Sequence, residues 1–555
     1  MAARTVVIVG GAVSGPTAAA RARELDEAAR IVLLERSRDV SYAACGLAYH
    51  LSGEAPSLDA LNRERADFFW DVYRVDVRTG VSALAIDAEA HAVRLKGEAL
   101  RYSALVYAAG AESVVPKVPN LAGASNVFRF RTLKDLEGIL RHLKGGAQRV
   151  AILGGGFIGV EAADGFLRHG SEVTLIEHRA KILPTFTTAM ANRGANALRA
   201  AGAKVLTGVE VVQAQREGRD VRALKLRTGA TVPTDLVIVA AGLRPRTDLL
   251  RRAGARLLAD GSVPVDNRCA TSLPDVFACG VCVSVAHAVS DKPVWIAQAA
   301  IADKTAQVAG GNAGGGDARM GPALGTAIVR ACDLTLARTG LTYSEAAAYA
   351  GSELASVCIH APSCEPYVPG STPATIELLY HGRSGRVLGA EVASAAGADK
   401  RVDVLAAAIL AGLTVDRLGS LDLAYTPAYA PARDPVNVAG VVAEASRQGL
   451  ARAWTPAQLA AQRRSLALVD VRSAPEHKAG TIGGAVGIPL PKLRGRMSAL
   501  RGKKRVVFLC DTGRLGYLAA RIARQRGLSE AGYLSGGLRS WTAEGRVLSQ
   551  ERAPR

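Results

Sequence analysis

The stretch Val6-Val7-Ile8-Val9-Gly10-Gly11-Ala12-Val13-Ser14-Gly15 decides the fold at the start of the chain. Its apolar residues predict a buried strand, and the glycines that follow predict a tight turn into a helix. The next apolar run, Ile31 to Leu34, ends at Glu35, about 20 residues beyond Gly15. This order is typical of a βαβ unit that holds a dinucleotide's diphosphate at a helix N-terminus.

A second unit repeats the pattern at Gly154-Gly155-Gly156-Phe157-Ile158-Gly159, after the apolar run Val150 to Leu153. Its second strand, Val173 to Ile176, ends at Glu177. In both units the terminal carboxylate can accept a hydrogen bond from a ribose 2′-hydroxyl. One such unit is weak evidence, whereas two units, each with its acid, indicate two dinucleotide sites.

A single cysteine lies between the two glycine loops, in Ser41-Tyr42-Ala43-Ala44-Cys45-Gly46-Leu47. The chain has 8 cysteines with no framework spacing, so reduced thiols are the default. Two dinucleotide sites around one thiol suggest electron transfer from a nicotinamide through a flavin to sulfur. Because Cys45 has no neighbouring cysteine, its oxidised form must be a mixed disulfide or a sulfenate. The alternative is that Cys45 is an inert core residue.

Composition limits the class of protein. A chain of 555 residues with 49% hydrophobic content predicts several globular domains. No apolar run approaches the roughly 18 residues that cross a bilayer, and no signal-peptide pattern precedes the first strand, so we expect a cytoplasmic protein without a membrane partner. The net charge of +19 comes from dispersed arginines without an aromatic-plus-basic module. We therefore expect a pocket for a phosphorylated substrate, with no nucleic acid and no metal.

The rest of the chain continues as alternating elements. Apolar strands that end at Ala-Gly, Leu105 to Ala111 and Leu236 to Gly242, close the two units. The glycine-rich stretch Gly310 to Gly316 predicts a linker. Beyond it, residues 325–441 mix short strands with a helix, and the last hundred residues alternate strands and helices again, with Cys510 at the end of a strand.

With these motifs in hand, the chain resembles the flavin-dependent pyridine nucleotide-disulfide oxidoreductases. Within them it is similar to the single-cysteine branch of coenzyme A-disulfide reductases and CoA-persulfide reductases that is fused to a C-terminal rhodanese domain. The motifs that carry the resemblance cover nearly the whole chain: Ser41 to Gly46, Gly154 to Glu161, Asp275 to Gly280, Gly325 to Leu336, Tyr425 to Val436, Asp470 to Arg472, and Leu534 to Gly537.

The resemblance implies an α/β fold with two Rossmann-like dinucleotide-binding domains, an α+β dimerisation domain and a C-terminal α/β rhodanese domain. We expect a discontinuous FAD-binding domain at residues 1–112 and 240–312. The NAD(P)H-binding domain is expected at 113–239, the dimerisation domain at 320–445 and the rhodanese domain at 455–550.

The resemblance also implies an enzyme that uses FAD and NADH or NADPH to reduce CoA disulfide or CoA persulfide, with polysulfide as a further acceptor. Cys45 would alternate between a thiolate and a disulfide with CoA. Tyr367 and Tyr425 of a partner subunit would place phenols near the substrate sulfur, which implies a homodimer. Cys510 would carry sulfane sulfur to coenzyme A or to Cys45. Core packing for the tyrosines and a structural role for Cys510 remain alternatives.

Binding residues follow from the same resemblance. The expected cofactor-binding residues are Gly10, Gly11, Ala12, Gly15, Glu35, Arg36, Gly110, Gly154, Gly156, Gly159, Glu161, Glu177, Gly280 and Val281. The expected substrate-binding residues are Thr17, Arg21, Arg23, Ser41 and Arg433, whose guanidinium groups suit phosphate geometry. Glu177 would repel a 2′-phosphate and favour NADH, whereas His178 and Arg179 could accept NADPH, so the choice of nucleotide stays open.

The chain departs from the family pattern at several positions. Val281 stands where relatives carry an aspartate that bonds the flavin ribityl chain, a loss of about 1.5 to 3 kcal/mol. Ala12 replaces the second glycine of the fingerprint, and Arg514 is displaced by one position in the rhodanese loop. Two alternatives therefore stay open: an NADH oxidase acting on oxygen, and a flavin-deficient dimeric scaffold or sulfur carrier that displays the rhodanese domain.

Overall fold

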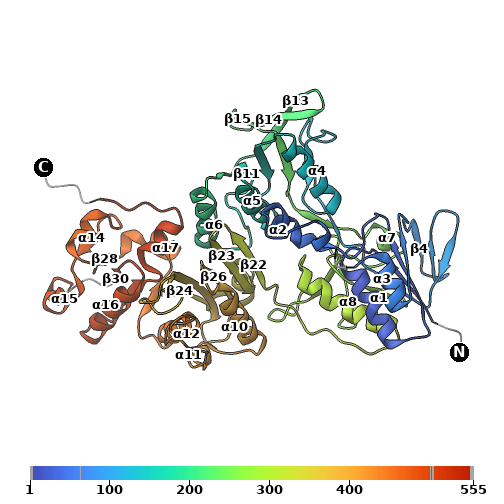
Figure 1. Cartoon of the computed structure of the whole chain (residues 1–555). Coiled ribbons are helices and arrows are strands. Elements are labelled where there is room, and N and C mark those ends of the chain that lie inside the picture. The colour runs from blue at the N-terminus through green and yellow to red at the C-terminus, as the bar shows by residue number, and fades with distance from the viewer. Residues whose placement is uncertain (1–3, 63, 501, 503–504, 551–555) are drawn as a thin grey trace. The chain divides into compact units, whose positions relative to one another are not determined.

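The computed structural model describes residues 4–550 apart from 63, 501, 503 and 504. The chain divides into two compact units (Figure 1): Met1–Ala180 with Leu198–Gly325, and Lys181–Ala197 with Thr326–Arg555. This division differs from the predicted boundaries at two places. Lys181–Ala197 lies within the predicted NAD(P)H-binding domain yet belongs to the second unit, and residues 320–325, predicted to begin the dimerisation domain, belong to the first. Among the described residues, no helix has the length and apolar character to cross a membrane.

The first unit contains two five-stranded parallel sheets. One has the order β19-β7-β1-β2-β3. Its strands are β1 (Thr5–Val9), β2 (Arg30–Glu35), β3 (Val75–Thr79), β7 (Ala104–Tyr107) and β19 (Val276–Ala278). Helices α1 (Ser14–Leu25), α3 (Ala66–Tyr73) and α8 (Ala299–Ala313) pack against it. Because helices cover a parallel sheet, its central strands are apolar without alternation, as Val6 to Val9 show.

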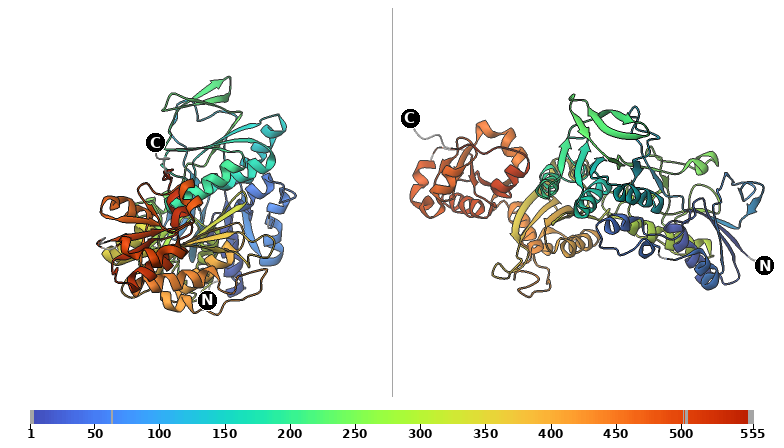
Figure 2. Two further views of the ribbon diagram at one scale, coloured as in Figure 1. Left: turned by 90° about the vertical axis from the view of Figure 1, so that its left-hand side faces the viewer. Right: turned by 45° about the horizontal axis from the view of Figure 1, so that its top comes forward.

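The second parallel sheet has the order β12-β11-β10-β16-β9. Its strands are β9 (Val127–Arg129), β10 (Arg149–Leu153), β11 (Glu172–Glu177), β12 (Lys204–Thr207) and β16 (Leu236–Val239), and helices α4 (Leu133–Lys144) and α5 (Phe157–His169) accompany it. The antiparallel strands β13 (Val211–Glu217), β14 (Asp220–Leu226) and β15 (Thr231–Pro233), green in Figure 2, extend from this domain. Where the chain crosses between the two sheets, β8 (Ala111–Ser113) pairs with β17 (Leu243–Pro245).

Shorter elements complete the first unit. They are α2 (Leu47–Leu51), α7 (Asp248–Arg252), the sheet of β4 (Ala85–Asp87), β5 (Ala92–Arg94) and β6 (Ala99–Arg101), and the sheet of β18 (Val263–Pro264), β20 (Val283–Ala286) and β21 (Pro293–Trp295).

The predicted linker at Gly310 to Gly316 is wrong over its first half, since α8 continues to Ala313. A Cβ atom at Gly310 would lie 2.3 Å from the carbonyl oxygen of Ala18 in α1. The glycines therefore allow the backbones of α1 and α8 to approach closely (Figure 1), although the same composition is typical of a loop.

The second unit contains an antiparallel sheet of order β22-β23-β26-β25-β24. Its strands are β22 (Ala327–Ala331), β23 (Leu334–Gly340), β24 (Leu354–Pro362), β25 (Pro373–His381) and β26 (Val387–Ser394). The helices of this part are α6 (Thr188–Ala200), α9 (Tyr343–Ala350), α10 (Ala398–Leu410), α11 (Val415–Gly419) and α12 (Pro435–Arg447).

The C-terminal part of the second unit is a parallel sheet of order β27-β31-β30-β28-β29. Its strands are β27 (Arg452–Trp454), β28 (Ala467–Asp470), β29 (Val486–Gly487), β30 (Val506–Leu509) and β31 (Ala531–Leu534). Its helices are α13 (Pro456–Ala461), α14 (Ala474–Ala479), α15 (Leu490–Leu493), α16 (Arg514–Gln525) and α17 (Gly537–Ala543).

A row of polar residues crosses the antiparallel sheet. Register places Cys358 opposite Glu377, Glu377 opposite Glu391, and Glu391 opposite Arg338. The Glu391 carboxylate accepts bonds from the Thr187 amide at 2.9 Å and from the Thr187 hydroxyl at 2.7 Å. Burial, together with the neighbouring Glu377, raises the pKa of Glu391 to about 8, and burial also raises the pKa of Glu377. The two carboxyls therefore titrate as a coupled pair.

This acid pair predicts a pH-dependent stability. Because folding raises the pKa of Glu391, its contribution is fully present below the ordinary pKa of 4.5 and is lost as the pH rises toward 8. We expect the thermal midpoint of the wild type to fall across this window and Glu391→Gln to flatten the fall. Glu530→Gln, at an exposed position, serves as the control. An unchanged pH profile in Glu391→Gln would contradict the assignment.

Candidate active site

The two glycine loops have the same geometry. Gly10 and Gly154 both have φ of +111°, and a Cβ atom on either would lie 2.3 Å from a carbonyl oxygen, that of Ala108 or Ala240. The last glycine of each loop, Gly15 or Gly159, would place a Cβ atom within 2 Å of the carbonyl oxygen of its first glycine. Only glycine fits these positions, so each loop closes tightly at the N-terminus of α1 or α5 and leaves room there for a diphosphate.

The two predicted ribose acids support these loops. Glu35 accepts from the Gly11 amide, and Glu177 accepts from the Gly155 amide, both at 2.7 Å. The other oxygen of Glu35 accepts from Ser37, and that of Glu177 accepts from the Arg179 amide at 2.8 Å. Both carboxylates are buried and fixed at the carboxyl end of a strand, which is where a ribose would reach them.

The segment that carries Cys45 is hydrogen-bonded to the first glycine loop. The Ser41 amide donates to the Gly11 carbonyl at 2.9 Å, and the Tyr42 amide donates to the Ala12 carbonyl at 3.1 Å. Cys45 follows in a short 3₁₀ turn and is exposed. The interpretation of Cys45 as an inert core thiol is therefore wrong, because a core thiol would be buried.

Helix α2, which begins two residues after Cys45, packs on α5 of the second nucleotide domain. A Cβ atom at Gly165 of α5 would lie 3.0 Å from the Ala48 carbonyl oxygen of α2. Cys45 thus lies in the chain between the segment bonded to the first glycine loop and helix α2, which packs on α5.

Two arginines that the sequence did not single out lie near this segment. Arg131 follows β9, and Arg246 follows β17. Burial lowers the pKa of Arg131, while the negative forms of Tyr42 and Cys45 raise it. Burial, with the positive charges of Arg36 and Arg131, also lowers the pKa of Arg246. Its Nε atom has no hydrogen-bond partner among the described residues but lies 3.7 Å from the Glu112 carboxylate.

Arg131 and Arg246 lie near the buried Tyr42, and Arg36 lies near Arg246, so three positive charges in one region suit an anionic ligand such as a dinucleotide. Burial raises the pKa of the Tyr42 phenol, so this ring stays neutral at physiological pH. The signal available in the sequence was the position of each arginine just after a strand, where open α/β sheets bind their ligands.

The predicted flavin-contact segment follows β19. The Gly280 amide donates to the Thr305 hydroxyl at 2.9 Å, and a Cβ atom at Gly280 would meet the Ser14 hydroxyl at 2.6 Å. Val281 lies beside Gly110, since a Cβ atom there would be 3.6 Å from the valine side chain. The glycine cradle, Glu35 and the three arginines thus fit FAD, whereas position 281 offers no carboxylate.

Cys279 and Cys282 are both buried free thiols. The Cys282 thiol lies 3.1 Å from the Cys279 carbonyl oxygen, and burial raises its pKa to about 12. This pair is therefore protonated core rather than a reactive dithiol.

The predicted substrate residues differ in their surroundings. The Thr17 hydroxyl bonds Asp303 at 3.3 Å, Arg21 pairs with Glu24 at 2.6 Å, and Ser41 is buried with φ of +54°. The prediction for Arg23 is wrong, because this side chain is buried and its guanidinium donates to four backbone carbonyl oxygens, those of Asp26, Glu27, Tyr73 and Arg74. Arg23 secures the turn after α1, and four of its five N–H donors are taken by backbone carbonyl oxygens.

In the second unit, the predicted phenols are at the surface. Tyr367 is 72% exposed and Tyr425 is 52% exposed, which excludes the alternative of core packing. Arg433, in the same loop as Tyr425, is also exposed. Its neighbour Asp434 is held by the buried Arg401 at 2.9 Å and caps α12 through the Val436 amide.

The Cys510 thiol lies in a cradle of backbone amides at the start of α16. The amides of Gly513 and Gly516 donate to Sγ at 3.1 and 3.3 Å. Burial raises the pKa of this thiol, and the surrounding amides oppose the shift. On the neighbouring strand β28, Asp470 of the Asp-Val-Arg motif is fully buried and binds Arg472 at 2.7 Å. Arg514 begins α16 and is exposed.

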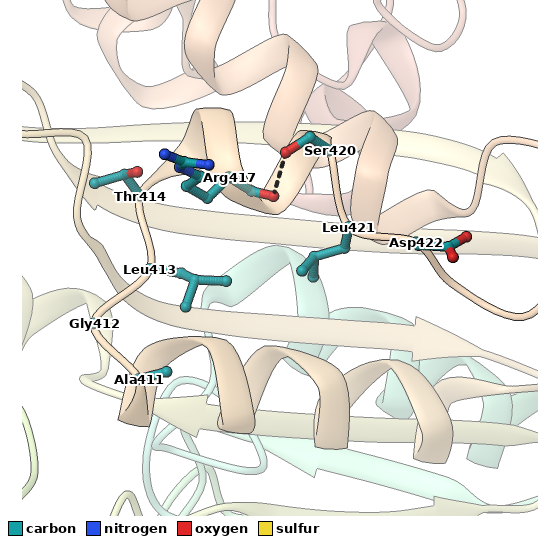
Figure 3. Close-up of a pocket in the computed structure, with 8 residues that line it drawn as sticks. All are labelled: Ala411, Gly412, Leu413, Thr414, Arg417, Ser420, Leu421 and Asp422. Atoms are coloured by element: carbon teal, nitrogen blue, oxygen red, sulfur yellow. Dashed lines mark hydrogen bonds between the residues drawn. The ribbon is translucent and has the colours of Figure 1, made fainter.

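A pocket of about 520 Å³ lies elsewhere in the second unit (Figure 3). Its lining comes from the connection between α10 and α11, from α11 itself and from the residues that follow it: Ala411, Gly412, Leu413, Thr414, Arg417, Ser420, Leu421 and Asp422. None of these is a predicted site residue. In the described part of the chain, no group of three or more metal-ligating side chains comes together.

Two dinucleotide sites beside an exposed thiol define a nucleotide-dependent thiol oxidoreductase. Comparison with known families agrees: residues 4–306 match the pyridine nucleotide-disulphide oxidoreductase family, 326–435 match the dimerisation domain of that family, and 455–544 match the rhodanese-like domain. The chain belongs to the pyridine nucleotide-disulphide oxidoreductases and carries a C-terminal rhodanese-like domain. The cofactors of this family are FAD and NAD(P)H.

Individual relatives narrow the comparison. A CoA-dependent NAD(P)H sulfur oxidoreductase of Pyrococcus abyssi is 30% identical over 78% of this chain and 97% of its own length. The reduced Bacillus anthracis CoADR-RHD has a TM-score of 0.94 at 29% identity, covering 99% of this chain and all of that one. The NAD-dependent persulfide reductase from A. fulgidus has a TM-score of 0.89 at 31% identity, covering 97% of this chain and all of that one.

The valine at position 281 predicts a measurable weakness in flavin binding. We expect Val281→Asp to lower the Kd for FAD by about tenfold or more, because a carboxylate would add one charge-assisted hydrogen bond. Fluorescence titration of the apoprotein measures this change, with Val281→Asn as the uncharged control. Equal or weaker binding in Val281→Asp would contradict the assignment of this segment to the flavin.

Proposed function

We propose that this protein reduces a disulfide or persulfide of coenzyme A with NADH, through Cys45 as its single redox thiol. The observation that carries the proposal is the exposed Cys45, in a segment whose Ser41 and Tyr42 amides form two backbone hydrogen bonds with the first glycine loop. The names of the relatives support the substrate class, since they include CoA-dependent sulfur and persulfide reductases. Bound FAD supplies the two-electron relay between the nicotinamide and the thiol.

The chemistry at Cys45 balances in two steps. Its thiolate attacks the S–S bond of CoA disulfide, which forms Cys45–S–S–CoA and releases one CoA thiolate. Reduction of this mixed disulfide by two electrons then releases the second CoA thiol and restores Cys45. NADH supplies the two electrons and one proton and becomes NAD⁺, and solvent supplies the second proton needed to form two CoA thiols. With a CoA persulfide the products are CoA thiol and hydrogen sulfide. Arg131 beside Cys45 would stabilise the thiolate form in both cases.

The remaining predicted residues complete the proposal. Thr17, Arg21, Ser41 and Arg433 would hold the anionic substrate, and Tyr367 and Tyr425 would reach the substrate sulfur from the partner of a homodimer. Both tyrosines are exposed, and this exposure supports a role in the partner's site, because a residue that serves the partner's site is exposed in its own chain. Cys510 would accept sulfane sulfur in its amide cradle and pass it to the CoA thiolate, forming the CoA persulfide that Cys45 consumes.

Replacing the thiol tests the central step. We expect Cys45→Ser to lower the rate of CoA disulfide reduction by at least about a thousandfold, because the hydroxyl cannot form the mixed disulfide. Anaerobic bleaching of the flavin by NADH should persist, which separates loss of the thiol from loss of the cofactor. Cys332→Ser, which removes a thiol between β22 and β23, is the control. A wild-type rate in Cys45→Ser would refute the proposal.

Glu177 tests the choice of nucleotide. We expect the wild type to prefer NADH, because the fixed Glu177 carboxylate repels a 2′-phosphate. Glu177→Gln keeps an acceptor for the Gly155 amide but removes the charge, and should raise the ratio of kcat/KM for NADPH over NADH by about tenfold. Glu172→Ala, at the exposed start of the same strand, should leave the ratio unchanged. A wild type that prefers NADPH would contradict this assignment.

A further inference from the structure

The antiparallel sheet of β22 to β26, which lies in the region that matches the dimerisation domain, is called the dimerisation sheet below. Residues 535–540, which follow β31, cover one edge of this sheet. Strand β24 lies at the end of the sheet order, so one side of its backbone lacks a partner strand. Ser535 satisfies that side at Cys358: its hydroxyl accepts from the Cys358 amide at 2.8 Å and donates to the Cys358 carbonyl oxygen at 3.3 Å. Ser535 is 1% exposed, so both bonds are shielded from water.

His360, two residues further along β24, adds a second contact to the same segment. Its Nε2 atom lies 3.1 Å from the Gly536 carbonyl oxygen, and its Nδ1 atom lies 2.8 Å from the Thr375 hydroxyl. Burial, followed by the charges of Arg193 and Arg539, lowers the pKa of His360 to about 3, so the ring is neutral. Because a carbonyl oxygen can only accept, the proton is on Nε2 and Nδ1 accepts from Thr375.

A third contact joins β24 to the segment after β31. The Cys358 thiol lies 3.2 Å from the hydroxyl of Ser540, and burial raises the pKa of this thiol to about 12, which keeps it protonated. Gly536, with φ of +66°, is enclosed, since a Cβ atom there would lie 2.0 Å from the Ser540 hydroxyl oxygen and 2.8 Å from the Cys358 sulfur. We call Cys358, His360, Ser535, Gly536 and Ser540 the edge-strand joint.

The opposite side of the same segment supports the Cys510 loop. The Leu538 amide donates to the Cys510 carbonyl oxygen at 2.8 Å, and the Arg539 amide donates to the Asp511 carbonyl oxygen at 3.0 Å. The Arg539 side chain also binds the Asp511 carboxylate at 2.7 Å. Gly537 permits this approach, because a Cβ atom there would lie 2.4 Å from the Cys510 carbonyl oxygen.

We infer that the edge-strand joint positions the sulfur-carrying loop, so that the dimerisation sheet, and not the rhodanese-like domain alone, sets the geometry of Cys510. The inference deepens the proposed function and rests on it for the sulfur chemistry of Cys510. Ser535 and His360 are positioning residues, since they reach Cys510 only through residues 536–540. The hydrogen bonds of the joint itself join neutral groups, whereas the charges nearest to it are those of Glu377, Arg193 and the Arg539–Asp511 ion pair.

The test uses the full-length, FAD-loaded enzyme and two readouts: hydrogen exchange of the amides of residues 510–516, and sulfur transfer from thiosulfate to cyanide. We expect Ser535→Ala and His360→Leu each to speed exchange in this loop by about tenfold and to lower kcat for sulfur transfer by at least about fivefold. His360→Gln, which keeps an N–H for the Gly536 carbonyl, should restore most of both values. Ser356→Ala, on the same strand but outside the joint, should change neither, and flavin reduction by NADH should be unaffected throughout.

The outcomes separate the joint from the proposed function. Exchange and kcat that stay at wild-type values in Ser535→Ala and His360→Leu would overturn the inference. Faster exchange in these variants together with a wild type that transfers no sulfur would support the joint and overturn the sulfur-transfer role of Cys510. Equal loss in His360→Leu and His360→Gln would also count against the joint, because the retained donor would then have no effect.

Discussion

The structure of the candidate site depends on two backbone hydrogen bonds, from the Ser41 and Tyr42 amides to the Gly11 and Ala12 carbonyl oxygens. They fix the thiol-bearing segment to the same loop that receives a dinucleotide diphosphate. A side-chain contact could be lost by substitution, whereas these bonds follow from the path of the chain. The proposed redox thiol and the first glycine loop are therefore parts of one local structure, and the glycines at positions 10 and 15 are required for both.

Electrostatics give the site its preference for anions. Arg131 and Arg246 lie near a neutral Tyr42, and Arg36 lies near Arg246. The Arg246 Nε atom is buried without a hydrogen-bond partner among the described residues. Keeping the partly buried guanidinium groups of Arg131 and Arg246 from water has a cost, which the Glu112 carboxylate, 3.7 Å from the Arg246 Nε atom, offsets in part and a negative ligand would offset further. A bound dinucleotide supplies that charge, so ligand binding and the stability of this region are expected to be coupled. These three arginines contribute to the chain's net charge of +19 and would favour an anionic ligand at this site.

Much of this arrangement could be predicted from the sequence because it depends on residue type at fixed spacing. Gly154 and Gly159 behave as their pattern predicts, and Glu177 occupies the end of its strand. Long-range packing was less accessible: Gly310 looked like a linker residue because its contact, the Ala18 backbone, is distant in sequence. Arg23 looked like a phosphate ligand because composition does not show that the side chain is buried and that backbone carbonyl oxygens take four of its five donors. The joint between β24 and residues 535–540 has no local signature either.

The most direct measurement is an anaerobic titration of the CoA-disulfide-treated enzyme with NADH, with free thiols and protein-bound CoA counted at each point. If Cys45 holds the mixed disulfide, one equivalent of NADH releases one CoA thiol per protomer and a further equivalent bleaches the flavin, and peptide mapping finds the CoA adduct on the peptide that contains Cys45. Flavin reduction after a single equivalent, with no CoA bound to that peptide, would contradict the account.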